Sequence, residues 1–386
     1  GSILRFIYYM NRKVTLLYIS LACVLSLQAQ TRQQMGGVYY AYPEGPSAKT
    51  GTFGTATYVM SDSLSVPQGY APFYISHYGR HGSRWMPKDD RYVWICKHFE
   101  DESNLTPLGL QVKGMLQRVW ENAKGNGGRL SKLGALQHQG IAHRMFERYP
   151  QIFAAGNAVK ARSSVVDRCA KSMQAFTSEL HSLQPGLNLD VKTDSADMAW
   201  IAYVSPEVKD LENRTHVQAQ VSPRRFLLQL FKDVSKVDEP LKLMTEMHTV
   251  ASSIQDVGLN FSSYPQDIED GLNALFTDDE FRAIYEANNL RMAINNGTVA
   301  TNEDIPARSA ISLWQNIEAE ADRALRSVKS SATLRFGHDT ALYRLLSLLF
   351  DVNVPPAGAR EEASLVVLGD EMEKMDRVVP MAANLQ

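Results

Sequence analysis

Cysteine is scarce in this chain, the two signs of charge nearly cancel, and long apolar runs are confined to its amino terminus. Three cysteines in 386 residues are too few for a disulfide framework, so the packed core has to supply the stability. Forty basic and 42 acidic residues leave no excess charge for a nucleic-acid backbone, which argues against a nucleic-acid partner. After residue 27 no stretch approaches the roughly 18 apolar residues of a membrane span, so none is expected in the mature chain.

Metal-ligating motifs are also missing. Glu246-Met247-His248 does not have the His-Glu-x-x-His spacing of a zinc helix, and the other histidines lack partners at ligand spacing. We therefore expect no metal and no cofactor. Beyond residue 29, Cys96 and Cys169 either pair in an oxidising compartment or remain separate buried thiols, and the sequence is compatible with both.

The amino terminus has the pattern of a secretory signal peptide over residues 10–29. A basic pair at 12–13 precedes a largely apolar run at 14–27, and Ala29 supplies a small residue at the expected cleavage point. We expect an exported protein, periplasmic or extracellular. A lipid anchor at Cys23 is the less favoured alternative, because the apolar run continues past it.

Helical and strand patterns alternate in both flanks of the remaining chain. Runs rich in β-branched and aromatic residues predict strands at 71–77, 158–161, 332–336, 364–368 and 378–385. Capping residues and apolar periodicity predict helices that begin at Thr106 and Ser131, and further helices over 223–234, 240–257, 278–289 and 305–327. In the last of these, one apolar stripe is predicted to face the core: Ile311, Trp314, Ile317, Ala321 and Leu325.

This order predicts an α/β fold in which a sheet core flanked by helices is split by a mainly α-helical cap insertion. The first part of the core is assigned to residues 30–183, the insertion to 184–329 and the second part to 330–386. Because the sequence stops inside the last predicted strand, we expect the core to be truncated at its carboxyl end.

The most informative segment is Arg80-His81-Gly82-Ser83-Arg84, directly after the first predicted strand. Ligand sites of α/β sheets lie at the carboxyl ends of strands. Arginine forks bind phosphate oxygens in bidentate geometry, and a neutral imidazole between them can attack phosphorus. Gly82 lets a substrate approach the backbone. An exposed basic turn is the alternative, which the preceding strand makes the less favoured one.

A second strand, at 332–336, leads through Gly337 into His338 and Asp339 at the start of an amphipathic helix. The imidazole there can bind a phosphate oxygen. A carboxyl group aimed at the same anion is expected to have a raised pKa and to protonate the leaving alkoxide. A helix N-cap is the alternative role for Asp339.

Taken together, these motifs resemble the histidine acid phosphatases, the clade of the histidine phosphatase superfamily that includes phytases and multiple inositol polyphosphate phosphatases. The segments 130–140 and 162–168 resemble two further motifs of that family. The resemblance covers about residues 71–386 and is least specific in the predicted insertion. It implies a phosphoglycerate-mutase-like sheet core.

The resemblance also implies a role for each site residue. His81 would be the nucleophile that becomes phosphorylated and Asp339 the general acid for the leaving group. The phosphate would be bound by Arg80, Arg84, Arg168 and His338. Water would then hydrolyse phospho-His81 without a metal, and Arg162 would hold the loop rather than touch phosphate.

The implied function is an exported phosphomonoesterase that acts on a small phosphate monoester through a phosphohistidine. Inositol polyphosphate phosphatases often carry His-Ala-Glu where this chain has His338-Asp339-Thr340, and many phytases have Asn where this chain has Ala341. The sequence is thus closer to general acid phosphatases, with an inositol polyphosphate phosphatase or phytase as an alternative. Two further candidates are a phosphomutase on the same core and a non-catalytic phosphate-binding protein.

Overall fold

The computed structural model describes residues 31–42, 52–53, 56–57, 68–257, 266–299, 301–327, 329–349 and 381–386. The predicted signal peptide at 10–29 and the predicted strand at 364–368 lie outside these residues. Residues Arg32–Gln386 form one compact unit, to which the following description is confined.

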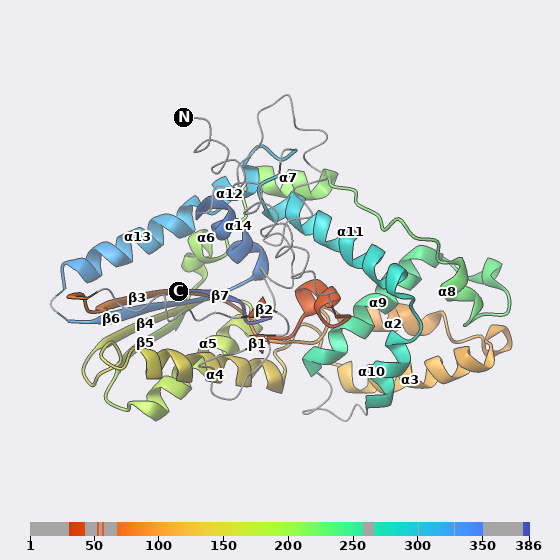
Figure 1. The fold of residues 1–386 in the computed structure, drawn as a ribbon, viewed down its shortest axis with the longest axis horizontal. Coiled ribbons are helices and arrows are strands. Elements are labelled where there is room, and N and C mark those ends of the chain that lie inside the picture. Colours follow the sequence, from red (N-terminus) through yellow and green to blue (C-terminus); the bar gives the residue numbers. More distant parts are fainter. Residues whose placement is uncertain are drawn as a thin grey trace, which may run out of the picture. The chain divides into compact units, whose positions relative to one another are not determined.

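Helices and strands alternate along the described chain (Figure 1). The strands are β1 (Thr52–Phe53), β2 (Ala56–Thr57), β3 (Tyr74–Arg80), β4 (Ala158–Ser163), β5 (Asn188–Thr193), β6 (Ser331–Gly337) and β7 (Asn384–Leu385). The α-helices are α2 (Asp89–Lys97), α3 (Pro107–Ala123), α4 (Lys132–Arg148), α5 (Asp167–Leu183), α6 (Met198–Ile201), α7 (Pro206–Arg214), α8 (Arg224–Leu228), α9 (Pro240–Val257), α10 (Gln266–Asn273), α11 (Asp278–Asn296), α12 (Ile305–Ser309), α13 (Ile311–Leu325) and α14 (Asp339–Leu349). Short 3₁₀ helices are η1 (Gln34–Tyr39), η3 (Glu102–Asn104), η4 (Ser195–Asp197) and η5 (Val234–Lys236).

Five strands form the central sheet in the order β5-β4-β6-β3-β7. The first four are parallel, and β7 pairs antiparallel with β3. Strand β6 comes last among the parallel strands in the chain, yet it lies between β4 and β3. All parallel strands therefore place their carboxyl ends at one edge of the sheet, and the prediction of an α/β sheet core flanked by helices is confirmed.

Helices α4 and α5 cover one face of the sheet, and α13 lies on the opposite face (Figure 1). On the α4/α5 side the strand residues Val159, Ala161, Leu334 and Phe336 are fully buried with Phe176 of α5. This apolar layer fixes the sheet beneath the two helices, because burying each such side chain contributes about 1.5–3 kcal/mol.

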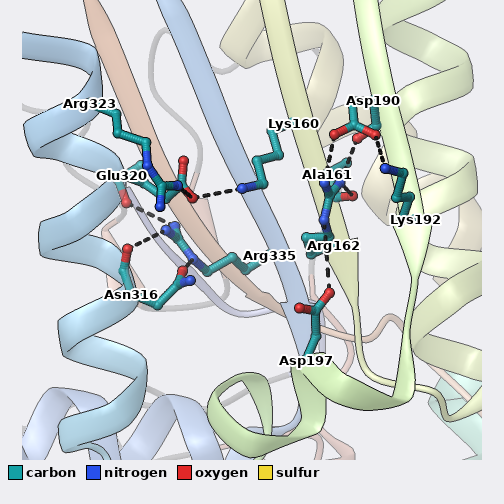
Figure 2. A network of polar contacts seen from close by, with 11 residues as sticks. Lys160, Ala161, Arg162, Asp190, Lys192, Asp197, Asn316, Glu320, Arg323 and Arg335 are labelled. Atoms are coloured by element: carbon teal, nitrogen blue, oxygen red, sulfur yellow. Dashed lines mark hydrogen bonds and ion pairs between the residues drawn. The ribbon is translucent and has the colours of Figure 1, made fainter. Parts of the chain in front are cut away.

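The opposite face is joined to α13 by polar contacts (Figure 2). Arg335 of β6 is fully buried and donates to Asn316 Oδ1 (2.9 Å) and to Ser76 Oγ (3.0 Å). On the same helix, Glu320 Oε1 lies 2.7 Å from Lys160 Nζ. Helix α13 therefore turns a polar side toward the sheet.

This orientation makes the prediction for the apolar stripe of α13 wrong at its two ends. Ile311 is 42% exposed and Leu325 is 67% exposed, whereas Leu313 and Ala324 are buried. Trp314 and Ile317 are partly buried against the core, as the stripe requires. The ion pair of Glu320 and the hydrogen bond of Asn316 set the rotation of the helix, which periodicity alone does not reveal.

Helix starts are predicted well from the sequence and helix lengths less well. Thr106 and Ser131 cap α3 and α4 by accepting hydrogen bonds from the amides of Gly109 and Gly134. The helix expected over 223–234 is limited to α8, and the one over 305–327 is interrupted between α12 and α13. The strand expected at 71–77 lies three residues later.

The division of the chain at residues 184 and 329 stays a proposal. Two elements of the proposed insertion are joined to the sheet. Strand β5, which the sequence analysis did not predict, pairs with β4, and helix α13 packs against β3. Among the residues that the structure describes, no helix combines the length and the apolar character needed to cross a membrane.

Candidate active site

The loops after three neighbouring strands meet at the carboxyl edge of the sheet. His81 follows β3, His338 follows β6, and Ser164 follows β4. Backbone hydrogen bonds continue past the strand ends, from His81 N to Gly337 O (2.9 Å) and from Ser164 N to Phe336 O (2.9 Å). The three loops are therefore fixed to one another, which brings segments far apart in the sequence into one site.

The imidazole of His81 is buried, and its hydrogen bonding defines its tautomer. Nδ1 lies 2.9 Å from Gly82 O, and a carbonyl oxygen only accepts, so Nδ1 carries the proton and Nε2 keeps its lone pair. Burial holds the pKa of His81 well below its ordinary value, and the charges of Arg80, Arg84 and Arg168 lower it further. A neutral imidazole with an unprotonated Nε2 is the form that can act as a nucleophile.

Close backbone packing holds the loop after His81 in place. A Cβ on Gly82 would lie 2.3 Å from Gly134 O, in the first turn of α4. The amide of Ser83 donates to Gln137 Oε1 (2.9 Å), also on α4. The segment 130–140 thus supports the loop, and glycine is required at both positions of contact.

Three arginines surround His81. The buried Arg80 donates through Nη1 to Val38 O (2.8 Å), and Arg84 donates through Nη1 to Trp85 O (2.9 Å). Nε of Arg84 and Nε of Arg168 are buried without a hydrogen-bond partner among the described residues. Burial lowers the pKa of Arg168, and the neighbouring charge of Arg84 lowers it further. Clustered guanidinium groups with donors left over are suited to an anion such as phosphate.

His338 lies on the other side of the site. Its ring centroid is 5.9 Å from that of His81, and its Nε2 lies 3.0 Å from Ser164 Oγ. Burial and then the charge of Arg168 lower the pKa of His338 to about 4. It is therefore neutral at moderate pH and able to donate a hydrogen bond to a phosphate oxygen.

Cys169 packs beside His338. Its Sγ donates to Gly337 O at 3.2 Å, and both Cys96 and Cys169 are free thiols. Of the two states compatible with the sequence, a disulfide and separate thiols, the structure shows the separate thiols.

The pKa of Asp339 is set by two opposing effects, its burial and the charges of nearby arginines. Burial by itself raises the pKa of this carboxyl, but the charges of Arg80 and Arg84 outweigh burial and hold the pKa below its ordinary value. Oδ2 of Asp339 lies 3.2 Å from Nη2 of Arg80. The sequence analysis expects a raised pKa for a carboxyl that faces a bound anion, and this stays a prediction, because the lowered pKa reflects the protein's own charges alone.

All six residues expected in the site lie around this edge of the sheet, whereas Arg162 points elsewhere. Its Nη2 pairs with Asp190 Oδ2 (2.6 Å) and its Nε approaches Asp197 Oδ2 (3.8 Å) (Figure 2). Arg162 thus joins β4 to β5 and does not reach His81.

Two contributors were missed by the sequence analysis. Helix η1 supplies Val38 O to Arg80, and the ring of Tyr39 lies 5.4 Å from the Arg84 guanidinium. His138, to which the sequence analysis assigns no role, is buried with Nε2 3.1 Å from Arg80 O. These contacts span 42 to 58 residues along the chain, and only the position of His138 inside the 130–140 segment pointed to it.

A cavity of about 310 Å³ lies beside Asp339 and Thr340, between η1, α9, α11 and α14. Tyr285, Asn288 and Asn295 contribute to its polar lining. Of the arginines there, Arg91 is paired with Glu246, whereas Arg291 donates to the neutral side chain of Asn288. The cavity adjoins the carboxyl expected to meet a leaving group. In the described part of the chain, no group of three or more metal-ligating side chains is present.

At the carboxyl edge of the α/β sheet, His81 with an unprotonated Nε2 lies near three arginines, and His338 precedes the carboxylate of Asp339. This arrangement is suited to a phosphate. Comparison with known proteins finds similarity to phosphatases. No family model matches the chain. Over 270 residues it is 24% identical to multiple inositol polyphosphate phosphatase 1 of Gallus gallus, an alignment that covers 67% of this chain and 58% of that relative. The chain thus spans less than two thirds of the relative's length.

Solved structures show the same fold. The multiple inositol polyphosphate phosphatase of Bifidobacterium longum in complex with inositol hexasulfate matches with a TM-score of 0.64 at 16% identity, over 91% of this chain and 88% of that one. The phytase from D. castellii matches with a TM-score of 0.55 at 13% identity, over 82% and 67%. The comparisons agree with the resemblance: the chain is similar in sequence to a multiple inositol polyphosphate phosphatase and shares its fold with a solved enzyme of that name and with a phytase.

Proposed function

We propose that the protein hydrolyses phosphate monoesters through a phosphohistidine at His81. The observation that carries the proposal is the neutral His81, whose unprotonated Nε2 lies among arginines with unused donors. Arg80, Arg84 and Arg168 would bind the phosphoryl oxygens, and His338 would donate a further hydrogen bond. Such a set of donors stabilises the charge that develops on the transferring phosphoryl group.

The chemistry has two steps. The lone pair of His81 Nε2 attacks phosphorus while the ester P–O bond breaks, and the leaving oxygen takes the proton of Asp339. Water then attacks phospho-His81, its proton returns to Asp339, and the N–P bond breaks to release phosphate. Asp339 can be protonated for the first step because a bound phosphate dianion offsets the positive charge that otherwise lowers its pKa.

For the leaving group we propose a polyol, with an inositol polyphosphate as the candidate to test first. The relatives' names support this choice. The cavity beside Asp339 has polar walls and the exposed cation Arg291, which suits a hydroxylated ring with a further phosphate. A general acid phosphatase remains the second candidate, favoured by the sequence His338-Asp339-Thr340-Ala341.

The first experiment measures phosphate release from p-nitrophenyl phosphate and from phytate, without metal, for the wild type and His81→Ala. We expect the substitution to lower kcat by at least about a thousandfold with either substrate, because the nucleophile is lost. His143→Ala is the control, since His143 is exposed and paired with Glu147 and Glu179 on the outer side of α4 and α5.

Mass spectrometry of a base-quenched reaction should find one phosphoryl group on His81. Release that survives His81→Ala would contradict the phosphohistidine route. Binding of phosphate with no turnover in the wild type would favour a non-catalytic binding protein.

We further propose that the protein is exported by a signal peptide at residues 10–29. Cell fractionation with sequencing of the mature amino terminus tests this. Export with cleavage after Ala29 is expected, and an intracellular chain that retains residues 10–29 would contradict it.

A further inference from the structure

Asp256, at the end of α9, contacts the loop after His81 from the helical region. Its Oδ1 accepts a hydrogen bond from Ser83 Oγ at 2.6 Å. Its main-chain oxygen accepts one from Ser131 Oγ at 2.7 Å, and the amide of Ser131 donates to Ser83 O at 2.9 Å. One residue thus holds the loop and the cap of α4 together, although 173 residues separate it from Ser83.

The carboxyl of Asp256 is fully buried, and its Oδ2 has no hydrogen-bond partner among the described residues. The charged groups that act on it are Arg84, in the loop, and Arg80, at the end of β3. Ser131, the uncharged cap of α4, contacts only the main-chain oxygen of Asp256. Burial raises the pKa of Asp256 to about 8, against the opposing effects of Ser83, Arg84 and Arg80. At acid and neutral pH the group is therefore protonated.

An uncharged carboxyl has a specific advantage at this place. A carboxylate beside Arg84 and Arg80 would compete with a phosphate for their positive charge, as charges of opposite sign interact strongly in a buried site. A neutral carboxyl still accepts from Ser83 and leaves the guanidinium charge to the ligand.

We propose that Asp256 is a positioning residue of the phosphate-binding loop, which it anchors in uncharged form through Ser83, and that its ionisation in alkaline solution weakens phosphate binding. This inference rests on the proposed function, because it concerns the same arginines.

The test uses inorganic sulfate as the probe, because sulfate remains a dianion from pH 6 to pH 9. Calorimetry gives its dissociation constant for the wild type, Asp256→Asn, Ser83→Ala and the control Asp322→Asn, a position on α13 away from the site. In the wild type we expect sulfate to bind about tenfold more weakly at pH 9 than at pH 6, since the competent form falls to about a tenth.

Asp256→Asn should bind about two- to threefold more weakly than the wild type at pH 6, because the amide fixes Ser83 less well, and should show no further loss at pH 9. Ser83→Ala should bind sulfate more weakly than the wild type at both pH 6 and pH 9. Its affinity should still fall between pH 6 and pH 9, because Asp256 is still present. Asp322→Asn should behave as the wild type.

Thermal unfolding provides a readout that needs no ligand. The native state keeps a proton on Asp256 that the unfolded chain loses, so native stability falls as pH rises from about 4 to 8. Asp256→Asn should therefore gain in Tm relative to the wild type over that range. If Asp256→Asn does not fold, Asp256→Ser, also uncharged, takes its place.

The outcomes distinguish failure of this inference from failure of the proposed function. An alkaline loss of sulfate binding that is the same in the wild type and in Asp256→Asn overturns the inference and leaves the proposed hydrolysis standing. A wild type that binds no sulfate at pH 6 overturns the phosphate site, and with it both proposals.

Discussion

At the scale of the residue, Asp339 has to satisfy two demands. In the site without substrate its Oδ2 lies 3.2 Å from Arg80 Nη2, and the arginines keep its pKa low. In the proposed mechanism it must carry a proton when the ester bond breaks. The charge of the substrate phosphate reconciles the two, because it neutralises the field that stabilises the carboxylate.

Asp339→Asn tests this role through the choice of leaving group. We expect kcat to fall by about 10²–10⁴-fold for an alkyl ester such as glycerol phosphate, whose alkoxide needs a proton. For p-nitrophenyl phosphate the loss should be less than about tenfold, because nitrophenolate leaves unprotonated. Steady-state kinetics with both substrates measure the difference, with Asp210→Asn on the exposed side of α7 as the control. Equal losses for the two esters would speak against proton donation by Asp339.

Sequence reasoning predicted that the six expected site residues lie near one another, but it could not predict their ionisation. His81, Arg80 and Arg84 follow one strand, and His338 and Asp339 follow another, so parallel pairing of two strands brings them together. The lowered pKa of Asp339 and the buried carboxyl of Asp256 depend on distances between loops that only the folded chain sets. No local pattern around residue 256 indicates a contact with Ser83.

At the scale of the element, α4 approaches the loop after His81 so closely that no side chain fits between them. A Cβ on Gly134 would lie 2.3 Å from Ser83 O and 2.8 Å from Ser83 N. The helix start can therefore lie against the loop only when this position lacks a side chain.

Gly134→Ala should displace the loop, lower stability by about 1–3 kcal/mol through overpacking and reduce kcat/KM at least about tenfold. Gly114→Ala is the matched control, because Gly114 lies inside α3 and a Cβ there would meet nothing within 4 Å. That change should raise stability by about 0.5–1 kcal/mol, since alanine is the better helix former. Urea unfolding measures the stability of both variants, and steady-state kinetics measure their kcat/KM. Similar changes in the two variants would contradict the claim that position 134 has no room for a side chain.

Local signals predicted where elements begin, and long-range contacts decided how they are oriented. The hydroxyls of Thr106 and Ser131 act on amides three residues away, so the sequence suffices to find them. Strand β5 does alternate, with Leu189 and Val191 between polar residues, but it is short and mostly exposed, and the sequence analysis did not assign it. The rotation of α13 follows from Glu320 and its partner Lys160, 160 residues away in the chain.

At the scale of the whole molecule, several histidines are buried in neutral form. Burial lowers the pKa of His77 and of His248 to about 3, and that of His138 to about 4. Both ring nitrogens of His77 lack a hydrogen-bond partner among the described residues, and its ring lies 5.4 Å from those of Phe176 and Phe336. The native protein therefore resists protonation that the unfolded chain accepts.

His77→Leu should make the protein less sensitive to acid. Below about pH 6.5 the unfolded chain binds a proton at residue 77 and the native state does so only near pH 3, so stability is lost as the pH falls. The variant should remove about 1.4 kcal/mol per pH unit from that slope between about pH 6 and 4. Denaturant unfolding across this range measures it, with His143→Leu on the surface as the control. An unchanged slope would contradict a neutral, buried His77.

The order of the strands has a consequence for how the protein is made. Strands β3 and β4 do not pair with each other, because β6 lies between them and forms hydrogen bonds with both. During synthesis the loop with His81 and the segment that leads from β4 to Arg168 consequently have no common sheet until residue 337 has emerged from the ribosome. Until then the nascent chain carries His81 without His338 and Asp339, and β6 joins β3 to β4 in the same step that brings these two residues to the site.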